Sequence, residues 1–133
     1  MKKLKSLPSL QRKLWKLCSE YIRRKDADEM EYVRCFTCGK SDHWKRLQCG
    51  HYIPSSVSLY LRYDEMNLKP QCVRCNMWLS SNATQYAIGL EKLYGPGILQ
   101  KLEEEKHKIT KFTRQDYEDK IAYYKAKLEA LCG

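Results

Sequence analysis

The first 26 residues carry apolar side chains at steps of three and four positions, which predicts an amphipathic helix over about residues 8–26. Pro8 suits the first turn of a helix, and the basic run at 23–25 suits the negative end of the helix dipole. The opposite face is strongly basic. The apolar face consists of Leu7, Leu10, Leu14, Leu17, Tyr21 and Ile22.

The middle of the chain changes to short strand-like segments, and helical spacing returns toward the end. Strands are expected at 32–36 and 47–53, and a loop at 55–68 with a short extended piece at 60–63. A helix is expected to begin near Asn76. Further helices are predicted at 83–94, from 98 to about 107, and at 113–131, the last with Thr113 and Asp116 as a capping box. This order predicts an α+β fold.

The length of 133 residues with 43% hydrophobic content suits one compact domain. We expect a single domain over 1–133, divided into a basic N-terminal helix (1–28), a core (30–95) and C-terminal helices (96–133). No apolar run approaches the roughly 20 residues that cross a bilayer, so no membrane contact is expected. Seven cysteines without a recognisable secretory leader favour a reducing cytoplasm.

Four of the cysteines form two Cys-x-x-Cys turns, Cys35 with Cys38 and Cys72 with Cys75. Each turn can present two thiolates to one ion, and two turns complete the tetrahedral shell of structural zinc. Redox chemistry is the alternative for one such turn, but two turns favour zinc. The other three cysteines are expected on a helix face, buried beside the site and free in the tail: Cys18, Cys49 and Cys132.

The net charge of +9 is concentrated at the N-terminus. Residues 1–25 hold nine Lys and Arg against one Glu, whereas residues 26–133 hold sixteen against fifteen acidic residues. This asymmetry favours a polyanionic partner such as DNA, while a solvated helix face is the plainer alternative. The candidate phosphate contacts are Arg62, Arg74 and Lys69 near the second Cys-x-x-Cys turn, and Arg12, Lys16 and Arg23 on the first helix.

The candidate chemistry lies between and just after the two Cys-x-x-Cys turns. His51, at the end of a predicted strand, can take a proton from water because its pKa is near neutrality, although a lone histidine is more often structural. Asn67 can hold the intervening loop. Asn76 can offer an amide oxygen to a divalent cation, Mg²⁺ or Mn²⁺. Asn82 is divided between a helix cap and a ligand of this cation.

The motifs around these residues resemble the NinG family, the Rap recombination nucleases of lambdoid phages, within the His-Asn-His (HNH, ββα-metal) nuclease superfamily. His51, Asn67 and Asn76 match the three signature positions of that superfamily. The more specific matches to the NinG family are Cys-x-x-Cys-Gly at 35–39, Gly-His-Tyr at 50–52, Leu-Arg-Tyr at 61–63, Glu65 with Asn67, Gln-Cys-Val-x-Cys-Asn at 71–76, and Ser81-Asn82.

The resemblance implies a zinc-braced ββα-metal core and a metal-dependent endonuclease acting on branched DNA, such as Holliday junctions and D-loops, in phage recombination. His51 would be the general base, Asn67 would orient its loop and Asn76 would bind the catalytic cation. A homodimer in the cytoplasm of a bacterial host, with no small-molecule substrate, follows from the same resemblance.

Gly50 departs from the superfamily pattern, in which many members carry Asp or His as a second cation ligand at this position. The cation must then rely on Asn76 with another group, such as Asn82 or Asp64, or on water and phosphate. The departure leaves an alternative function open: a zinc-finger DNA-binding protein without catalytic activity.

Overall fold

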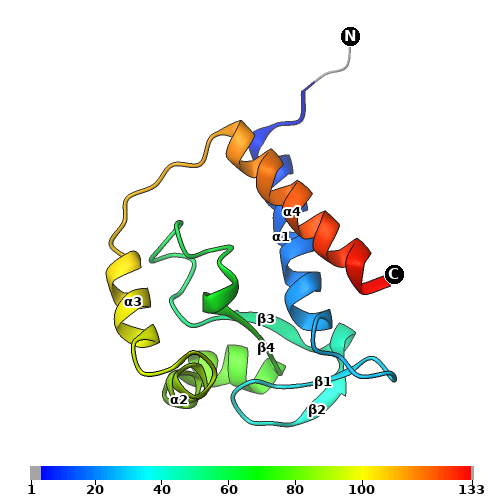
Figure 1. Ribbon diagram of the computed structural model, residues 1–133, viewed down its shortest axis with the longest axis vertical. Coiled ribbons are helices and arrows are strands. Elements are labelled where there is room, and N and C mark those ends of the chain that lie inside the picture. The colour runs from blue at the N-terminus through cyan, green and yellow to red at the C-terminus, as the bar shows by residue number, and fades with distance from the viewer. Residues whose placement is uncertain (1–3, 133) are drawn as a thin grey trace. The chain divides into compact units, whose positions relative to one another are not determined.

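The computed structural model describes residues 4–132, which group into two compact units. One unit comprises the chain ends, up to Tyr21 and from Lys111, and the other comprises Ile22–Thr110. Helices in both units and two small antiparallel sheets in the second confirm the α+β class (Figure 1). The expectation of one domain stays a prediction. Within residues 4–132, no helix has the combination of length and apolar character that a membrane span requires.

The terminal unit is built from α1 (Leu7–Arg24) and α4 (Arg114–Cys132), which lie side by side in Figure 1. Gln11 Nε2 donates to the Tyr117 hydroxyl at 3.0 Å, and the rings of Tyr21 and Tyr124 are 5.9 Å apart. Both helices begin and end within two residues of the prediction. The buried faces repeat every three to four positions, at Leu10, Leu14, Cys18 and Ile22 in α1 and at Tyr117, Ile121, Tyr124 and Leu128 in α4.

The ends of α1 and α4 add two details. The predicted capping box is present, because the Thr113 backbone N–H donates to Asp116 Oδ2 at 2.8 Å and the Asp116 N–H donates to Thr113 Oγ1 at 3.1 Å. The predicted apolar face of α1 begins one residue too early, since Leu7 is 41% exposed, and that of α4 ends one residue too late, since Leu131 is 39% exposed. Both lie in terminal turns of their helices, where fewer neighbours can cover a side chain.

The central unit contains two antiparallel hairpins. β1 (Tyr32–Arg34) pairs with β2 (Ser41–His43), and β3 (Gln48–His51) pairs with β4 (Leu68–Gln71). In the second hairpin, Gln48 faces Gln71 and His51 faces Leu68. The Phe36 N–H donates to the Pro70 carbonyl at 2.8 Å, which ties the first Cys-x-x-Cys turn to β4.

Three parts of the sequence-based assignment in this unit were wrong. Neither β2 nor β4 was expected as a strand. The predicted loop ended at residue 68, and no element was assigned between it and the second Cys-x-x-Cys turn. Residues 60–63 are turns rather than an extended piece. β4 contains Lys69, Pro70 and Gln71, which have low strand propensity, and proline cannot donate to a ladder. The strand forms because all four of its residues are buried by tertiary contacts.

Helices follow β4 and complete the core of the unit. A π-helix spans Arg74–Trp78, and α2 (Ala83–Tyr94) and α3 (Ile98–Glu105) begin where the sequence predicts. Three-residue 3₁₀ segments lie at Trp44–Arg46, Glu65–Asn67 and Ser80–Asn82. Tyr86 on α2 is fully buried, and its hydroxyl donates to the Gly50 carbonyl at 2.9 Å, so α2 is fixed against β3. The main core cluster consists of Ile53, Leu61, Tyr86, Leu90, Ile98 and Leu102.

Candidate functional site

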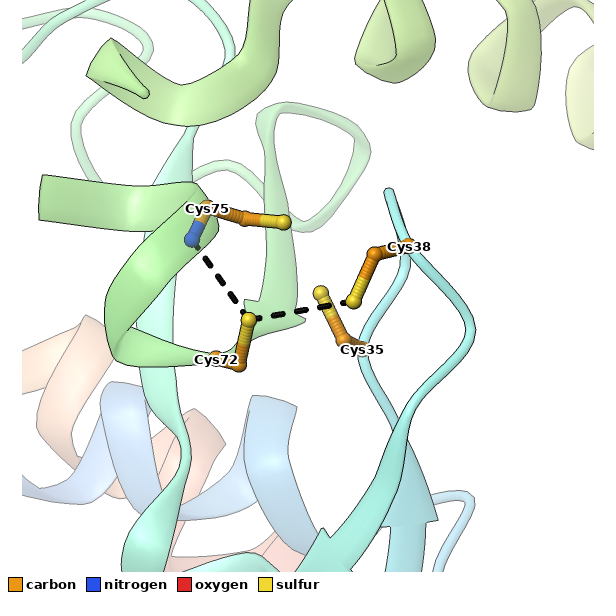
Figure 2. A group of neighbouring side chains, drawn as sticks. All are labelled: Cys35, Cys38, Cys72 and Cys75. Carbon is orange, nitrogen blue, oxygen red and sulfur yellow. Dashed lines mark hydrogen bonds between the residues drawn. The ribbon is translucent and has the colours of Figure 1, made fainter. Parts of the chain in front are cut away.

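The four cysteines of the two Cys-x-x-Cys turns converge in the central unit (Figure 2). Their sulfur atoms all lie within 4.8 Å of one another, and the Cys38 and Cys72 sulfurs are 3.8 Å apart. A tetrahedral zinc site with Zn–S bonds of about 2.3 Å has sulfur–sulfur edges of about 3.8 Å. The cluster is therefore compatible with zinc, as the sequence predicts. Cys18, Cys49 and Cys132 lie outside it, with Cys18 and Cys49 buried and Cys132 exposed.

Hydrogen-bond donors around Cys35 favour its thiolate form. The Thr37 hydroxyl lies 3.4 Å from Cys35 Sγ, and the Cys75 N–H donates to Cys72 Sγ at 3.4 Å. Burial acts to raise the pKa of Cys35, but the Thr37 hydroxyl and neighbouring backbone amides outweigh it and lower the pKa to about 6. Desolvation instead raises the pKa of Cys38, to about 12, and the pKa of Cys72. A thiolate is the form that binds a metal, so an ion must displace the protons of these two thiols when it binds.

The backbone after β4 is irregular where the candidate residues gather. Within the π-helix the Leu79 N–H donates to the Arg74 carbonyl at 2.9 Å, five residues back, which widens the turn that carries Cys75 and Asn76. Ser80, Ser81 and Asn82 follow with φ of 48°, 69° and 49°. Non-glycine residues rarely adopt this region, and both π-turns and such strained residues occur often at functional sites.

His51 lies at the end of β3 and is half-buried. Its Nε2 is 3.0 Å from the Arg62 carbonyl oxygen, which can only accept, so Nε2 carries the proton and the ring lone pair is on Nδ1. Burial lowers the pKa of His51, the Arg62 carbonyl acts against that change, and the Arg62 charge adds to it. The imidazole is therefore neutral at neutral pH, which is the state that can accept a proton.

Asn67 is fully buried and links both sides of the loop that follows His51. Its Oδ1 accepts from the Ile53 N–H at 2.7 Å, and its Nδ2 donates to the carbonyls of Ile53 at 3.0 Å and Leu61 at 3.2 Å. Since Leu61 directly precedes the residue that holds His51, these contacts are those needed to position the histidine. All of the side chain's amide groups are used within the protein.

Asn76 lies on the π-helix with its amide oriented by a neighbour. Its Nδ2 donates to Gln48 Oε1 at 2.8 Å, and its Oδ1 faces Gly50, 3.1 Å from where a Cβ on that glycine would lie. Asn82 instead directs Nδ2 toward Cys75 Sγ at 3.8 Å and makes no side-chain cap of α2, while Asp64 caps the 3₁₀ segment at Met66. Asn76 and Asn82, which were expected to share one cation, thus have different neighbours.

The sequence analysis assigned no role to Gln71, although Gln71 is fully buried beside these residues. The same Cβ on Gly50 would overlap Gln71 Oε1, an oxygen that has no hydrogen-bond partner. The signal in the sequence was the position of Gln71 inside the Gln-Cys-Val-x-Cys-Asn motif. Without knowledge of β4, nothing placed that side chain over Gly50.

Comparison with known proteins decides the family. The family model described as Bacteriophage Lambda NinG protein matches residues 1–132. The chain belongs to the NinG family. It is 32% identical over 113 residues to protein ninG of Salmonella phage P22, and 30% identical over the same length to protein ninG of Escherichia phage lambda. These matches cover 84% of this chain and 52% of each relative, so the chain spans about half the length of these relatives. No solved structure matches it.

The basic residues of this NinG-family chain differ in their availability to a phosphate. Arg74 is exposed, and so are Arg12 and Lys16 on α1. Arg62 is half-buried and donates from one guanidinium nitrogen to the Ser55 carbonyl at 3.0 Å. The guanidinium of Arg23 lies 5.1 Å from the centre of the Trp44 ring, which occupies one of its faces.

Lys69 lies in the interior, where it is 3% exposed. Its ammonium donates to the Glu65 carbonyl at 3.0 Å and to the Tyr94 hydroxyl at 2.6 Å, and burial lowers its pKa to about 8. The Lys69 ammonium therefore uses its hydrogen-bond donors within the fold. We therefore omit Lys69 from the proposed DNA contacts of this NinG-family protein.

Proposed function

We propose that this protein is a metal-dependent endonuclease of the HNH type that nicks branched DNA during phage recombination. Two antiparallel strands, β3 and β4, followed by a helical segment give the element order of a ββα-metal core. His51 ends the first strand, Asn67 holds the loop between the strands, and Asn76 lies on the helical segment. Membership of the NinG family supports the same assignment.

The observation that carries the proposal is the hydrogen bond from His51 Nε2 to the Arg62 carbonyl. It fixes the tautomer whose Nδ1 can accept a proton, and burial keeps the ring neutral by lowering its pKa. In the proposed reaction, a water oxygen attacks the phosphorus of a phosphodiester while its proton passes to His51 Nδ1. The bond from phosphorus to the leaving deoxyribose oxygen breaks, and that oxygen takes up a proton from solvent water, which leaves a nick.

Two metals have separate tasks in this proposal. Zinc held by Cys35, Cys38, Cys72 and Cys75 cross-links the β1–β2 hairpin to the start of the π-helix, and it is structural because the shell leaves no open position. A bound Mg²⁺ or Mn²⁺ would polarise the scissile phosphate and stabilise the leaving oxygen. The amide oxygen of Asn76 suits such an ion, since Mg²⁺ prefers oxygen ligands.

The substrate class and assembly rest on the resemblance together with charge. The exposed Arg74 next to Cys75, and the exposed Arg12 and Lys16 on α1, supply positive charge for a DNA backbone. Resolution of a junction requires paired nicks, so a homodimer with two active sites is part of the proposal.

Nicking of labelled Holliday-junction, D-loop and matched linear duplex DNA tests the proposal. Zinc-loaded wild type should nick near the branch point only with added Mg²⁺ or Mn²⁺, and His51→Ala should lose the activity while retaining zinc. His107→Ala is the matched control, because that histidine is exposed and lies on a different part of the unit. Binding of all substrates without nicking under any metal would support the zinc-finger DNA-binding alternative, and equal nicking of linear duplex would reduce the proposal to a general nuclease.

A further inference from the structure

Gln71 presents a buried oxygen that the fold leaves without a partner. Its Nε2 donates to the Ser81 carbonyl at 2.8 Å and to Thr37 Oγ1 at 3.0 Å. A backbone carbonyl can only accept, so the amide nitrogen must be the atom on that side and Oε1 must face the other way. Oε1 is buried and makes no hydrogen bond within the protein. A buried acceptor in this state destabilises the folded protein, so its retention needs a reason.

The orphaned oxygen points into the space that a side chain at position 50 would occupy. A Cβ added to Gly50 would overlap Oε1, lie 2.7 Å from Gln71 Cδ and lie 3.1 Å from Asn76 Oδ1. The amide oxygens of Gln71 on β4 and Asn76 on the π-helix therefore both lie beside the position that a Cβ of residue 50 would occupy. The register explains the reach, because Gly50 faces Lys69 and the side chain of Gln71 is its diagonal neighbour on the same face of the hairpin.

Both amides are held in this orientation by their nitrogen atoms. Asn76 Nδ2 donates to Gln48 Oε1, and Gln48 Nε2 is directed at Met77 Sδ at 3.6 Å. Gln71 Nε2 is held by Ser81 and Thr37 as described. Fixed nitrogens leave two fixed oxygens aimed at the same place, and Asn76 is half-buried, so the pair lies at the edge of the interior.

We propose that Gln71 Oε1 and Asn76 Oδ1 form the protein's ligand pair for the catalytic divalent cation, with Gln71 taking the place of the ligand side chain that many HNH proteins carry at position 50. This inference rests on the proposed function and extends it. Gly50 is then required by space, since any larger residue would displace the Gln71 oxygen. Two neutral oxygens bind a hard cation weakly, which suits Mg²⁺ because it keeps several of its waters.

Direct Mn²⁺ binding, measured by electron paramagnetic resonance on zinc-loaded protein without DNA, tests the ligand pair. Gln71→Leu removes the oxygen and should weaken Mn²⁺ binding by roughly tenfold or more. Gln71→Glu keeps an oxygen and adds charge but loses both donor groups, and it should bind Mn²⁺ at least as tightly as wild type. Gln85→Glu places the same charge on the exposed face of α2 and should leave the affinity unchanged.

The glutamate variant separates a ligand from a structural residue. If Gln71 serves only through its nitrogen, by holding Ser81 and Thr37, both substitutions should impair the protein alike, and that result would overturn the inference. Zinc content measured on every variant identifies any loss that comes through the cysteine cluster, because Thr37 lies against Cys35. A gain in affinity for Gln71→Glu cannot arise from misfolding.

The same experiment distinguishes the inference from the proposed function. Mn²⁺ binding that depends on residue 71, in a protein that never nicks DNA, would retain the cation site and reject the endonuclease. Nicking that requires His51, in a protein whose Mn²⁺ affinity is the same in wild type and Gln71→Leu, would retain the endonuclease and reject Gln71 as a ligand.

Discussion

Replacement of Asn67 by leucine should release the loop that positions His51. Leucine has a similar volume, so the substitution removes three buried hydrogen bonds without opening a large cavity. Each bond contributes about 1 kcal/mol, and a buried partner left unpaired costs about 1–3 kcal/mol, so we expect the substitution to cost about 3–5 kcal/mol. The Ile53 N–H is the group most affected, since its acceptor is Asn67 Oδ1 at 2.7 Å.

Hydrogen exchange at the Ile53 amide, followed by NMR, measures this cost at the site itself. A loss of about 3–5 kcal/mol in local stability raises the exchange rate roughly 10²–10⁴-fold, because each 1.4 kcal/mol is a factor of ten. Gln85→Leu, an exposed amide-to-leucine change, should leave that rate unchanged. A rise below about tenfold in Asn67→Leu would refute the claim that this side chain holds the loop.

Three further outcomes are expected. Wild type should contain one zinc per chain by elemental analysis, Cys75→Ser should lose it, and Cys49→Ser, in a buried cysteine outside the cluster, should keep it. Gly50→Ala should lower the free energy of unfolding by about 1–3 kcal/mol in urea, since its methyl overlaps the Gln71 amide; an unchanged midpoint would contradict that packing. Folding lowers the pKa of His51, so its contribution to the free energy of unfolding is fully present above the unfolded pKa of 6.5 and is lost as pH falls through the folded pKa. In urea titrations, His51→Gln should therefore lose less stability than wild type as the pH is lowered.

Periodic segments were predicted well from the sequence because a helix leaves a repeated signal. The boundaries of α2 at 83–94 agree with the prediction at both ends, and the capping box of α4 is present. The cysteine cluster was predicted equally well, since spacing within each Cys-x-x-Cys turn restricts where two sulfurs can lie. The helices and each Cys-x-x-Cys turn depend on residues that are close in the chain, and the preference of zinc for four thiolates predicted that the two turns meet.

The features that sequence analysis missed depend on contacts between distant residues. β4 contains a proline and two polar residues, and its strand state comes from pairing with β3 and from burial. Lys69 was a reasonable phosphate contact by charge, but both faces of β4 are covered, and the Lys69 ammonium donates to the Tyr94 hydroxyl in the interior. The π-turn at Arg74–Trp78 has no periodic signal in the sequence, which predicted only that a helix begins near Asn76.

The missing side chain at position 50 illustrates how a motif can mislead when it is judged one residue at a time. From the sequence, Gly50 removes a cation ligand and leaves open a protein without catalytic activity. In the structure the space above Gly50 contains the oxygen of Gln71, which lies 21 positions later but is its diagonal neighbour across the hairpin. A neutral amide oxygen from β4 is a weaker cation ligand than a carboxylate at position 50, but it occupies the same space. The absence of a ligand residue from a motif is therefore weak grounds for inactivity until the neighbouring strand has been placed.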